Sequence, residues 1–177
     1  MKKTVISIIA IIAIAAACVF VGSLPQTKTE YLRIHIRANS NGDIDQAVKY
    51  AVKEKVVDYL TPYLAECDSK QKAEDMLKVK LSDICDIADK TLKEKGFDYG
   101  AKARVNGEKF PTRVYGELTL EAGYYDALII ELGEGAGDNW WCVVYPPLCF
   151  TGQGRNYTYK SKIAEIIKNF FAQKEGK

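Results

Sequence analysis

The stretch from Gly133 to Phe150 constrains the fold of this chain more than any other part of the sequence. A glycine-rich loop leads into a strand that contains both tryptophans, and two adjacent prolines then stop the strand, because proline has no N–H to donate to a sheet. Trp140 and Trp141 are neighbours in this strand, so their side chains point to opposite faces of the sheet. One of them can fill a core, while the other has to meet solvent, a covering helix or a binding partner.

Residues 1–24 have the shape of an export signal. Lys2 and Lys3 precede an unbroken apolar run from Val5 to Val21, and small residues and a proline follow. The run is long for a signal core and barely long enough to cross a membrane, so a cleaved signal peptide and an N-terminal membrane anchor over residues 4–24 both remain open. Residues 25–30 are then a polar linker, and residues 31–177 are predicted to form a single exported domain.

The charge of the exported part argues against nucleic-acid binding. Without Lys2 and Lys3, the 25 basic residues fall to 23 and match the 23 acidic residues. A nucleic-acid binder needs a basic surface to neutralise phosphates, and a formally neutral domain does not supply one.

The four cysteines of the exported part suggest one disulfide. Export makes disulfides permissible, and Cys142 and Cys149 are the best pair because the chain can fold back at the prolines between them. Cys67 and Cys85 are a poorer pair, since a helix that begins near Ser69 carries Cys85 about 24 Å along its axis. Cys85 adjoins the apolar stripe of that helix, which favours a buried core thiol.

The hydrophobic pattern predicts an α+β fold. Apolar residues at helical spacing indicate a helix over residues 43–63, capped by Asp43 and with Lys49 and Lys53 facing water, and a second helix from Ser69 to about Lys95. Alternating or apolar runs indicate strands, an Asn106-Gly107 turn separates two of them, and a last helix starts at Ser161. The strands are predicted at residues 31–38, 99–105, 112–120, 126–132 and 140–145, with a short edge strand at residues 157–160. We expect a mostly antiparallel sheet with a long helical hairpin and a C-terminal helix packed on one face.

No set of residues in the sequence points clearly to catalysis. His35 is the single histidine, and it alternates with Arg33 and Arg37 on the face of the first strand that we expect to be solvated. A Cys–His nucleophile pair would need His35 beside a reduced cysteine, and the scattered cysteines do not have zinc-site spacing. A strand, not a helix, follows the Gly133-x-Gly135-x-Gly137 loop, so a mobile hairpin loop is favoured over a phosphate site. We expect no catalytic residue, metal or cofactor.

Several blocks of the sequence resemble the stage II sporulation protein R family. The most specific block is Asn139-Trp140-Trp141-Cys142-Val143 with Pro146-Pro147-Leu148-Cys149-Phe150. The resemblance extends upstream through residues 133–137 and 122–128. A further block lies near the N-terminus, in His35-Ile36-Arg37-Ala38-Asn39-Ser40 and Asp45-Gln46 with Lys49.

The resemblance implies an exported, non-enzymatic signal of endospore formation. Such proteins are made in the forespore and exported into the space between the two sporulation membranes, where they activate a membrane-embedded aspartic protease of the mother cell. That protease then removes the pro-sequence of sigma-E. The expected partner contacts are Asn139, Trp140 and Trp141, followed by Arg37 and Asn39. The chain is expected to contact the membrane only through its leader. The alternatives are an extracytoplasmic hydrolase of the cell-wall space and a structural envelope protein.

Overall fold

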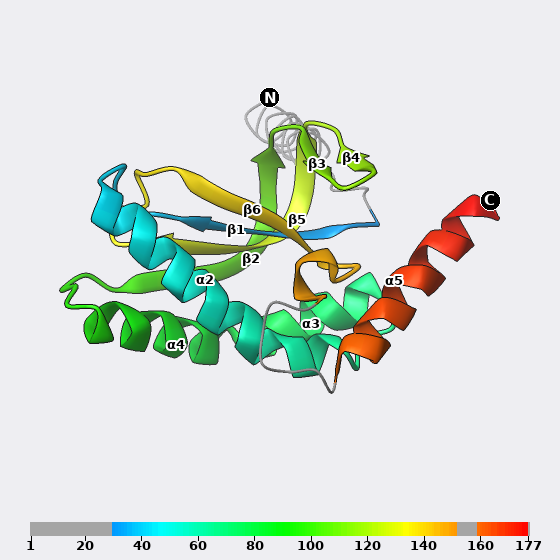
Figure 1. Ribbon diagram of the computed structural model, residues 1–177, viewed down its shortest axis with the longest axis horizontal. Helices are drawn as coiled ribbons and strands as arrows, with labels where there is room; N and C mark the ends of the chain where they lie inside the picture. The colour runs from blue at the N-terminus through cyan, green and yellow to red at the C-terminus, as the bar shows by residue number, and fades with distance from the viewer. Residues whose placement is uncertain (1–29, 152–158, 177) are drawn as a thin grey trace, which may run out of the picture.

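The computed structural model of the protein describes residues 30–151 and 159–176 of the 177-residue chain. The described elements mix helices and strands, which confirms the predicted α+β class (Figure 1). In chain order they are β1 (Leu32–Arg37), α2 (Asp43–Leu64), α3 (Lys70–Val79), α4 (Leu81–Glu94), β2 (Ala101–Phe110), β3 (Arg113–Tyr115), β4 (Leu118–Leu120), β5 (Gly123–Leu132), β6 (Asn139–Tyr145), the 3-10 turn η1 (Leu148–Phe150) and α5 (Lys160–Glu175).

The main sheet has four strands in the order β2-β5-β1-β6. The pairings β2–β5 and β1–β6 are antiparallel, and the central pairing β1–β5 is parallel. The sheet is therefore mostly antiparallel, as predicted. However, β5 and β6 are consecutive in the chain and lie on either side of β1. The loop between them crosses the end of β1, so the prediction of a hairpin loop was wrong.

Three helices cover one face of this sheet, α2, α3 and α4 (Figure 1). The apolar stripe of each helix packs against the side chains that β1, β5 and β6 present on that face, among them Ile34, Ile130 and Val144. The helix predicted from Ser69 to Lys95 is divided at Lys80, which ends α3 and precedes α4. This division lets α4 pack along α2 and β2, while α3 also reaches β1 and β6.

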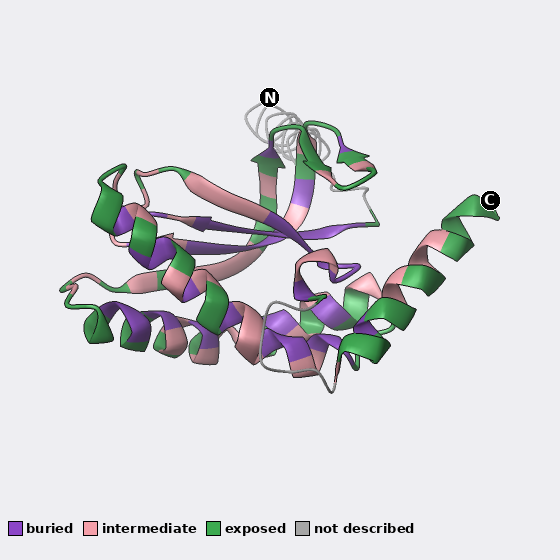
Figure 2. Ribbon diagram, viewed as in Figure 1, coloured by how far each residue is buried: buried purple, intermediate pink, exposed green. Residues whose placement is uncertain are grey.

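The opposite face of the sheet is covered as well. Figure 2 shows β1 buried along almost its whole length. Arg33 and His35 have no exposed surface. The guanidinium of Arg33 lies 4.2 Å from the ring centroid of Phe110 and 4.7 Å from that of Tyr125, and it donates a 2.7 Å hydrogen bond to Tyr115 Oη. We predicted that this face of β1 is solvated. The prediction was wrong because β1 is a central strand, and aromatic side chains from the neighbouring strands cover this face.

The segment after β2 also differs from expectation. The predicted turn at Asn106-Gly107 is absent, because β2 runs straight through these residues and pairs along the whole of β5. The predicted strand over residues 112–120 is instead the small hairpin of β3 and β4, which turns at Gly116 with φ of +61°.

The C-terminal helix α5 begins one residue before the predicted Ser161. Its Phe170 ring lies 5.4 Å from the ring of Tyr31 and 5.8 Å from that of Tyr145. The helix therefore packs at the end of the sheet where β1 starts and β6 ends. The predicted leader at residues 1–24, most of the linker and the first half of the strand predicted at residues 157–160 lie outside the described residues. The second half of that predicted strand is wrong, because α5 begins at Lys160. Within residues 30–151 and 159–176, no helix has the length and apolarity that a membrane span requires.

Candidate functional site

Two segments far apart in the sequence meet at the end of β1. The segment Arg37–Asn41 lies against the loop and strand start Gly133–Asn139, and we call these residues together the junction. Three backbone hydrogen bonds join the two segments: Ala136 N–H to the Asn39 carbonyl at 3.2 Å, Gly137 N–H to the Ala38 carbonyl at 2.9 Å, and Ala38 N–H to the Asp138 carbonyl at 3.4 Å. The loop is tied down, so the expected mobile loop was wrong.

Asn39 is the centre of the hydrogen bonds at the junction. Its side-chain oxygen accepts a 3.0 Å bond from the backbone N–H of Glu134, and its Nδ2 donates a 2.9 Å bond to Asp45 Oδ2. Asp45 also accepts bonds from Ser40 Oγ and Tyr99 Oη, both at 2.6 Å. These bonds favour the charged carboxylate, and the bond from Ser40 contributes most to a lowered pKa of Asp45. Asn39 is thus fixed between the loop and the first turn of α2.

Lys49, in α2, binds the same loop through its side chain. Its side chain is almost fully buried, although the helical pattern predicted that it faces water. Its Nζ donates a 2.6 Å bond to Gln46 Oε1 and a 2.9 Å bond to the Asp138 carbonyl. Burial lowers the pKa of Lys49, and the nearby Asp138 partly opposes that shift. The prediction failed because the loop covers this part of α2, which the pattern of one helix alone does not reveal.

The glycines of the loop are required by this close approach. A Cβ on Gly133 would lie 2.3 Å from Asn39 Oδ1, and a Cβ on Gly137 would lie 2.2 Å from the backbone oxygen of Ser40. Gly133 also has a φ of +57°, which side chains rarely adopt. The Gly-x-Gly-x-Gly pattern therefore reflects a loop pressed against another backbone.

A cluster of charged side chains supports the junction on the face away from the helices. Arg37 Nη1 lies 2.7 Å from Glu131 Oε1 and its Nη2 meets Glu108, while Arg104 Nη1 lies 2.5 Å from Glu131 Oε2. The bond from Arg104 contributes most to a lowered pKa of Glu131. Arg37, one of the predicted contact residues, is thus held by two carboxylates and remains partly exposed.

His35 lies beneath this cluster and is not poised for chemistry. Its ring centroid lies 4.7 Å from that of Trp141, and Nε2 lies 3.1 Å from Glu108 Oε2 without hydrogen-bond geometry. Burial, followed by the charges of Arg37 and Arg104, lowers the pKa of His35 to about 3. The ring is therefore neutral at ordinary pH, and it lies on the sheet face opposite to Cys142.

The predicted contact residues gather at the start of β6. In the register of β1 and β6, Arg37 pairs with Asn139, Ile36 with Trp140 and His35 with Trp141. The two tryptophans are half-buried on opposite faces, as expected. The ammonium of Lys53 lies 5.9 Å from the Trp140 ring centroid, and the Arg113 guanidinium lies 5.7 Å from that of Trp141.

A disulfide joins the later part of β6 to η1. Cys142 and Cys149 are bonded, with their Cα atoms 6.3 Å apart, while Cys67 and Cys85 are free. Cys85 is half-buried rather than fully buried, and burial raises the pKa of both free thiols. The bond fixes the residues that follow β6 against the helix-covered face. In the described part of the chain, no group of three or more His, Cys, Asp or Glu side chains could hold a metal ion.

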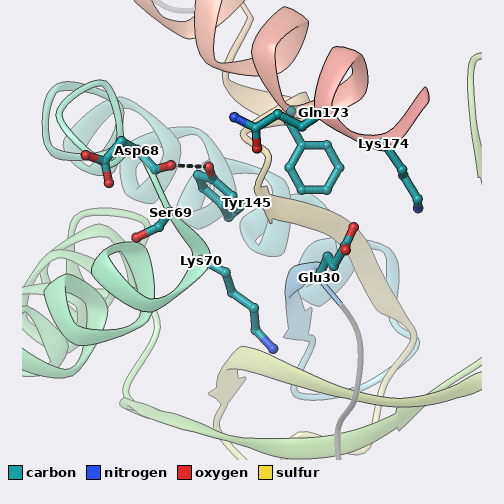
Figure 3. Close-up of a pocket in the computed structure, with 8 residues that line it drawn as sticks. Glu30, Asp68, Ser69, Lys70, Tyr145, Gln173 and Lys174 are labelled. Atoms are coloured by element: carbon teal, nitrogen blue, oxygen red, sulfur yellow. Dashed lines mark hydrogen bonds between the residues drawn. The ribbon is translucent and has the colours of Figure 1, made fainter. Parts of the chain in front are cut away.

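A small pocket lies at the other end of β1, away from the junction. Its volume is about 240 Å³, and Figure 3 shows Glu30, Lys70 and Lys174 around it, while the carboxylate of Asp68 points away from Tyr145. Tyr145 Oη donates a 2.7 Å bond to the Asp68 carbonyl and so ties the end of β6 to the start of α3. The lining carries both signs of charge, so it does not select one class of charged ligand.

The side chains that sequence reasoning did not assign to the site are those that hold it together: Asp45, Lys49, Tyr99, Glu108 and Glu131. A sequence signal existed for Asp45 and Lys49, because both lie in the N-terminal block that resembles the sporulation family. No such signal exists for Tyr99 or Glu131, which reach the junction only through the sheet order.

Comparisons with known proteins confirm the family resemblance seen in the sequence. A family model described as "Stage II sporulation protein R (spore_II_R)" matches residues 28–155. Stage II sporulation protein R of Bacillus subtilis (strain 168) is 37% identical over 119 residues, which cover 67% of this chain and 53% of the relative. The chain thus spans about half the length of the curated relative it matches. No solved structure matches the chain significantly.

Proposed function

The chain belongs to the stage II sporulation protein R family, and from that premise we propose that it is an exported signal that activates a membrane-embedded aspartic protease of the mother cell. The protease would then remove the pro-sequence of sigma-E. In this proposal the chain acts by binding and contributes no catalytic residue. It would be exported from the forespore into the intermembrane space, with residues 1–24 as a cleaved signal or a membrane anchor.

The observation that carries this proposal is the meeting of the two most family-like blocks at one place. The block from His35 to Ser40 and the block from Gly133 to Trp141 form the junction through direct hydrogen bonds. Glycines that tolerate no Cβ and a buried Lys49 keep the junction in one arrangement. A surface that is already rigid loses little conformational entropy when it binds, so it suits a protein that acts as a ligand.

Activation by binding needs a difference in affinity between two states of the protease. A ligand shifts an equilibrium only as far as it binds one state better than the other. We place the contact at Asn139, Trp140 and Trp141, with Arg37 and Asn39 beside them. Tryptophan and arginine often dominate binding energy at protein interfaces, and both tryptophans retain exposed surface here.

The leader and the disulfide support the proposed location. Residues 1–24 have the basic and apolar pattern of an export signal, and the bond between Cys142 and Cys149 suits an oxidising compartment. Disulfides are rare in the cytosol, where thiols are kept reduced.

Co-expression tests the proposal without the other events of sporulation. The full-length chain, the protease and the sigma-factor precursor are produced together in a bacterium that forms no spores. We expect the precursor to be cleaved with the full-length chain and to stay intact with a matched chain that lacks residues 1–24. Cleavage at the same rate in the absence of the chain would show that direct activation is wrong.

A further inference from the structure

β6 lies at one edge of the main sheet. In the strand order β2-β5-β1-β6, β6 pairs on one side with β1, and among the described residues no strand pairs with its other side. Its residues are Asn-Trp-Trp-Cys-Val-Val-Tyr, which favour strands and carry no charge. An open strand of this kind is a template for pairing with another chain.

The register identifies which backbone groups of β6 face outward. Ala38 N–H donates to the carbonyl of Asp138, so these opposite residues form a hydrogen-bonded pair. Because such pairs alternate along antiparallel strands, Trp140 and Cys142 also point their N–H and C=O groups toward β1. The N–H and C=O groups of Asn139, Trp141 and Val143 therefore point away from β1, but Val143 is fully buried and only Asn139 and Trp141 retain exposed surface.

The opposite edge of the sheet, β2, is protected in the usual ways. Its sequence contains Lys102, Arg104 and Lys109, and charged side chains discourage pairing at an edge. Two of its N–H groups are also bonded to side chains: Ala101 N–H to Asp89 and Gly107 N–H to Asn106. Along β6 the residues from Cys142 to Tyr145 are buried, and among the described residues only the start of the strand, Asn139–Trp141, lacks comparable protection. The contrast suggests that the start of β6 is left open for use.

The charges beside β6 indicate what could bind there. Lys53 lies over Trp140 on the helix-covered face, and Arg113 lies over Trp141 on the other face. Glu54 approaches Lys53 only to 3.9 Å and is mostly exposed, and Arg113 forms no ion pair with a described residue. A strand added to β6 would present its side chains alternately toward Lys53 and toward Arg113. Acidic side chains at those positions would complement both cations.

We propose that Asn139–Trp141 binds an extended, acidic segment of the partner protein as an additional strand of the sheet. This inference rests on the proposed function, since the partner is the protease named there. Main-chain hydrogen bonds to Asn139 and Trp141 supply affinity, and the two tryptophans with their cations select the side chains of the added strand. The disulfide at Cys142 holds the receiving strand in place.

Amide hydrogen exchange gives the most specific test, because strand addition predicts an alternating pattern. The full-length chain is measured at single-residue resolution, alone and with the purified protease, in detergent micelles. The amides of Asn139 and Trp141 should exchange at least about tenfold more slowly in the complex, since paired edge amides open rarely. The amides of Trp140 and Cys142, already bonded to β1, should change little.

The result also separates this inference from the proposed function. Suppose that precursor cleavage requires the chain and a complex forms, but the outward amides exchange as fast as in the free chain. Strand addition is then wrong, while activation by binding stands. If no complex forms and cleavage does not depend on the chain, both are wrong. Equal protection of the outward amides in the chain without protease would indicate pairing between two copies of this chain and would also overturn the inference.

Two variants at one residue provide a second readout. Asn139→Pro removes an outward N–H at the first residue of the strand, where proline is tolerated, and Asn139→Ala removes the side chain but keeps that N–H. The proline variant should bind the protease about tenfold more weakly than the alanine variant, which corresponds to ~1.4 kcal/mol. Thermal unfolding of both variants checks the fold. Equal binding by two folded variants would contradict strand addition.

Discussion

Asn39 accepts a hydrogen bond from the backbone N–H of Glu134 at 3.0 Å across 95 positions of sequence. This contact joins the end of β1 to the loop that crosses it. The same side chain donates to Asp45 at the start of α2, so one residue connects a strand, a loop and a helix. The position of the loop therefore depends on Asn39. Because β6 begins immediately after this loop, the position of its first residues depends on Asn39 as well.

Replacing Asn39 should weaken both the fold and the proposed binding. Asn39→Ala removes two hydrogen bonds, which we expect to lower the free energy of unfolding by about 1–2 kcal/mol. Urea unfolding of the full-length chain measures this change. Asn106→Ala on the exposed part of β2 is the matched control and should cost less than about 0.5 kcal/mol. Equal effects of the two substitutions would mean that Asn39 has no special structural role.

The glycine at position 137 should tolerate no side chain. In Gly137→Ala the new Cβ would meet the Ser40 backbone oxygen at 2.2 Å, so the loop has to move. We expect a loss of about 1–3 kcal/mol in the free energy of unfolding, as for other overpacked sites. Gly123→Ala in β5 is the control, because its Cβ would make an ordinary 3.6 Å contact with Tyr125. A neutral Gly137→Ala would contradict the close crossing of loop and strand.

His35 should make the free energy of unfolding depend on pH between about pH 5 and pH 7. Few other side chains change their protonation in this range. The pKa of His35 is about 3 in the folded protein and about 6.5 in the unfolded chain, so between these values the unfolded chain binds the additional proton. Stability should therefore fall as the pH falls below 6.5, by up to about 1.4 kcal/mol per pH unit.

The measurement is the free energy of unfolding between pH 7 and pH 5, above the range in which unfolded carboxylates titrate. His35 is the single histidine of the chain, so His35→Phe should remove the slope in this window. A slope that persists in the variant would show that another group causes it.

Reduction of the disulfide should destabilise the protein moderately. The bond between Cys142 and Cys149 closes a short loop, and the loop-closure entropy of such a loop corresponds to about 2–3 kcal/mol. We expect a lower melting temperature in reductant and in the double variant C142A/C149A, with no further effect of reductant on that variant. Cys85→Ala, which removes a free thiol, should keep the sensitivity to reductant. A wild-type melting temperature that reductant leaves unchanged would contradict this prediction.

Local patterns in the sequence were enough to predict most helices and strands. A local hydrophobic pattern between residues a few positions apart is enough to indicate a helix or a strand. Such patterns predicted the helix after Asp43, the strand around Trp140 and the last helix at Ser161. The break at Lys80 was missed, since Val79-Lys80-Leu81 contains no helix breaker. The turn at Asn106-Gly107 was wrong because β5 offers a partner to the whole of β2. Pairing with a distant strand outweighed the local turn preference.

The role of the predicted contact residues stays a prediction, and the way the structure brings them together could not be predicted. The contact candidates Arg37, Asn39, Asn139, Trp140 and Trp141 do lie together, yet their proximity depends on β1 lying between β5 and β6. The burial of Lys49 and His35 has the same origin. The pattern of apolar and polar residues within one strand or helix does not reveal which distant segments of the chain will cover that element.

Photocrosslinking at the junction tests the central claim most directly. A photoreactive phenylalanine derivative replaces Trp141 in one full-length chain and the exposed Val79 at the end of α3 in another, and each is co-expressed with the protease and the precursor. The account predicts a crosslink to the protease from position 141 and none from position 79. Crosslinking from position 79 but not from position 141 would contradict it.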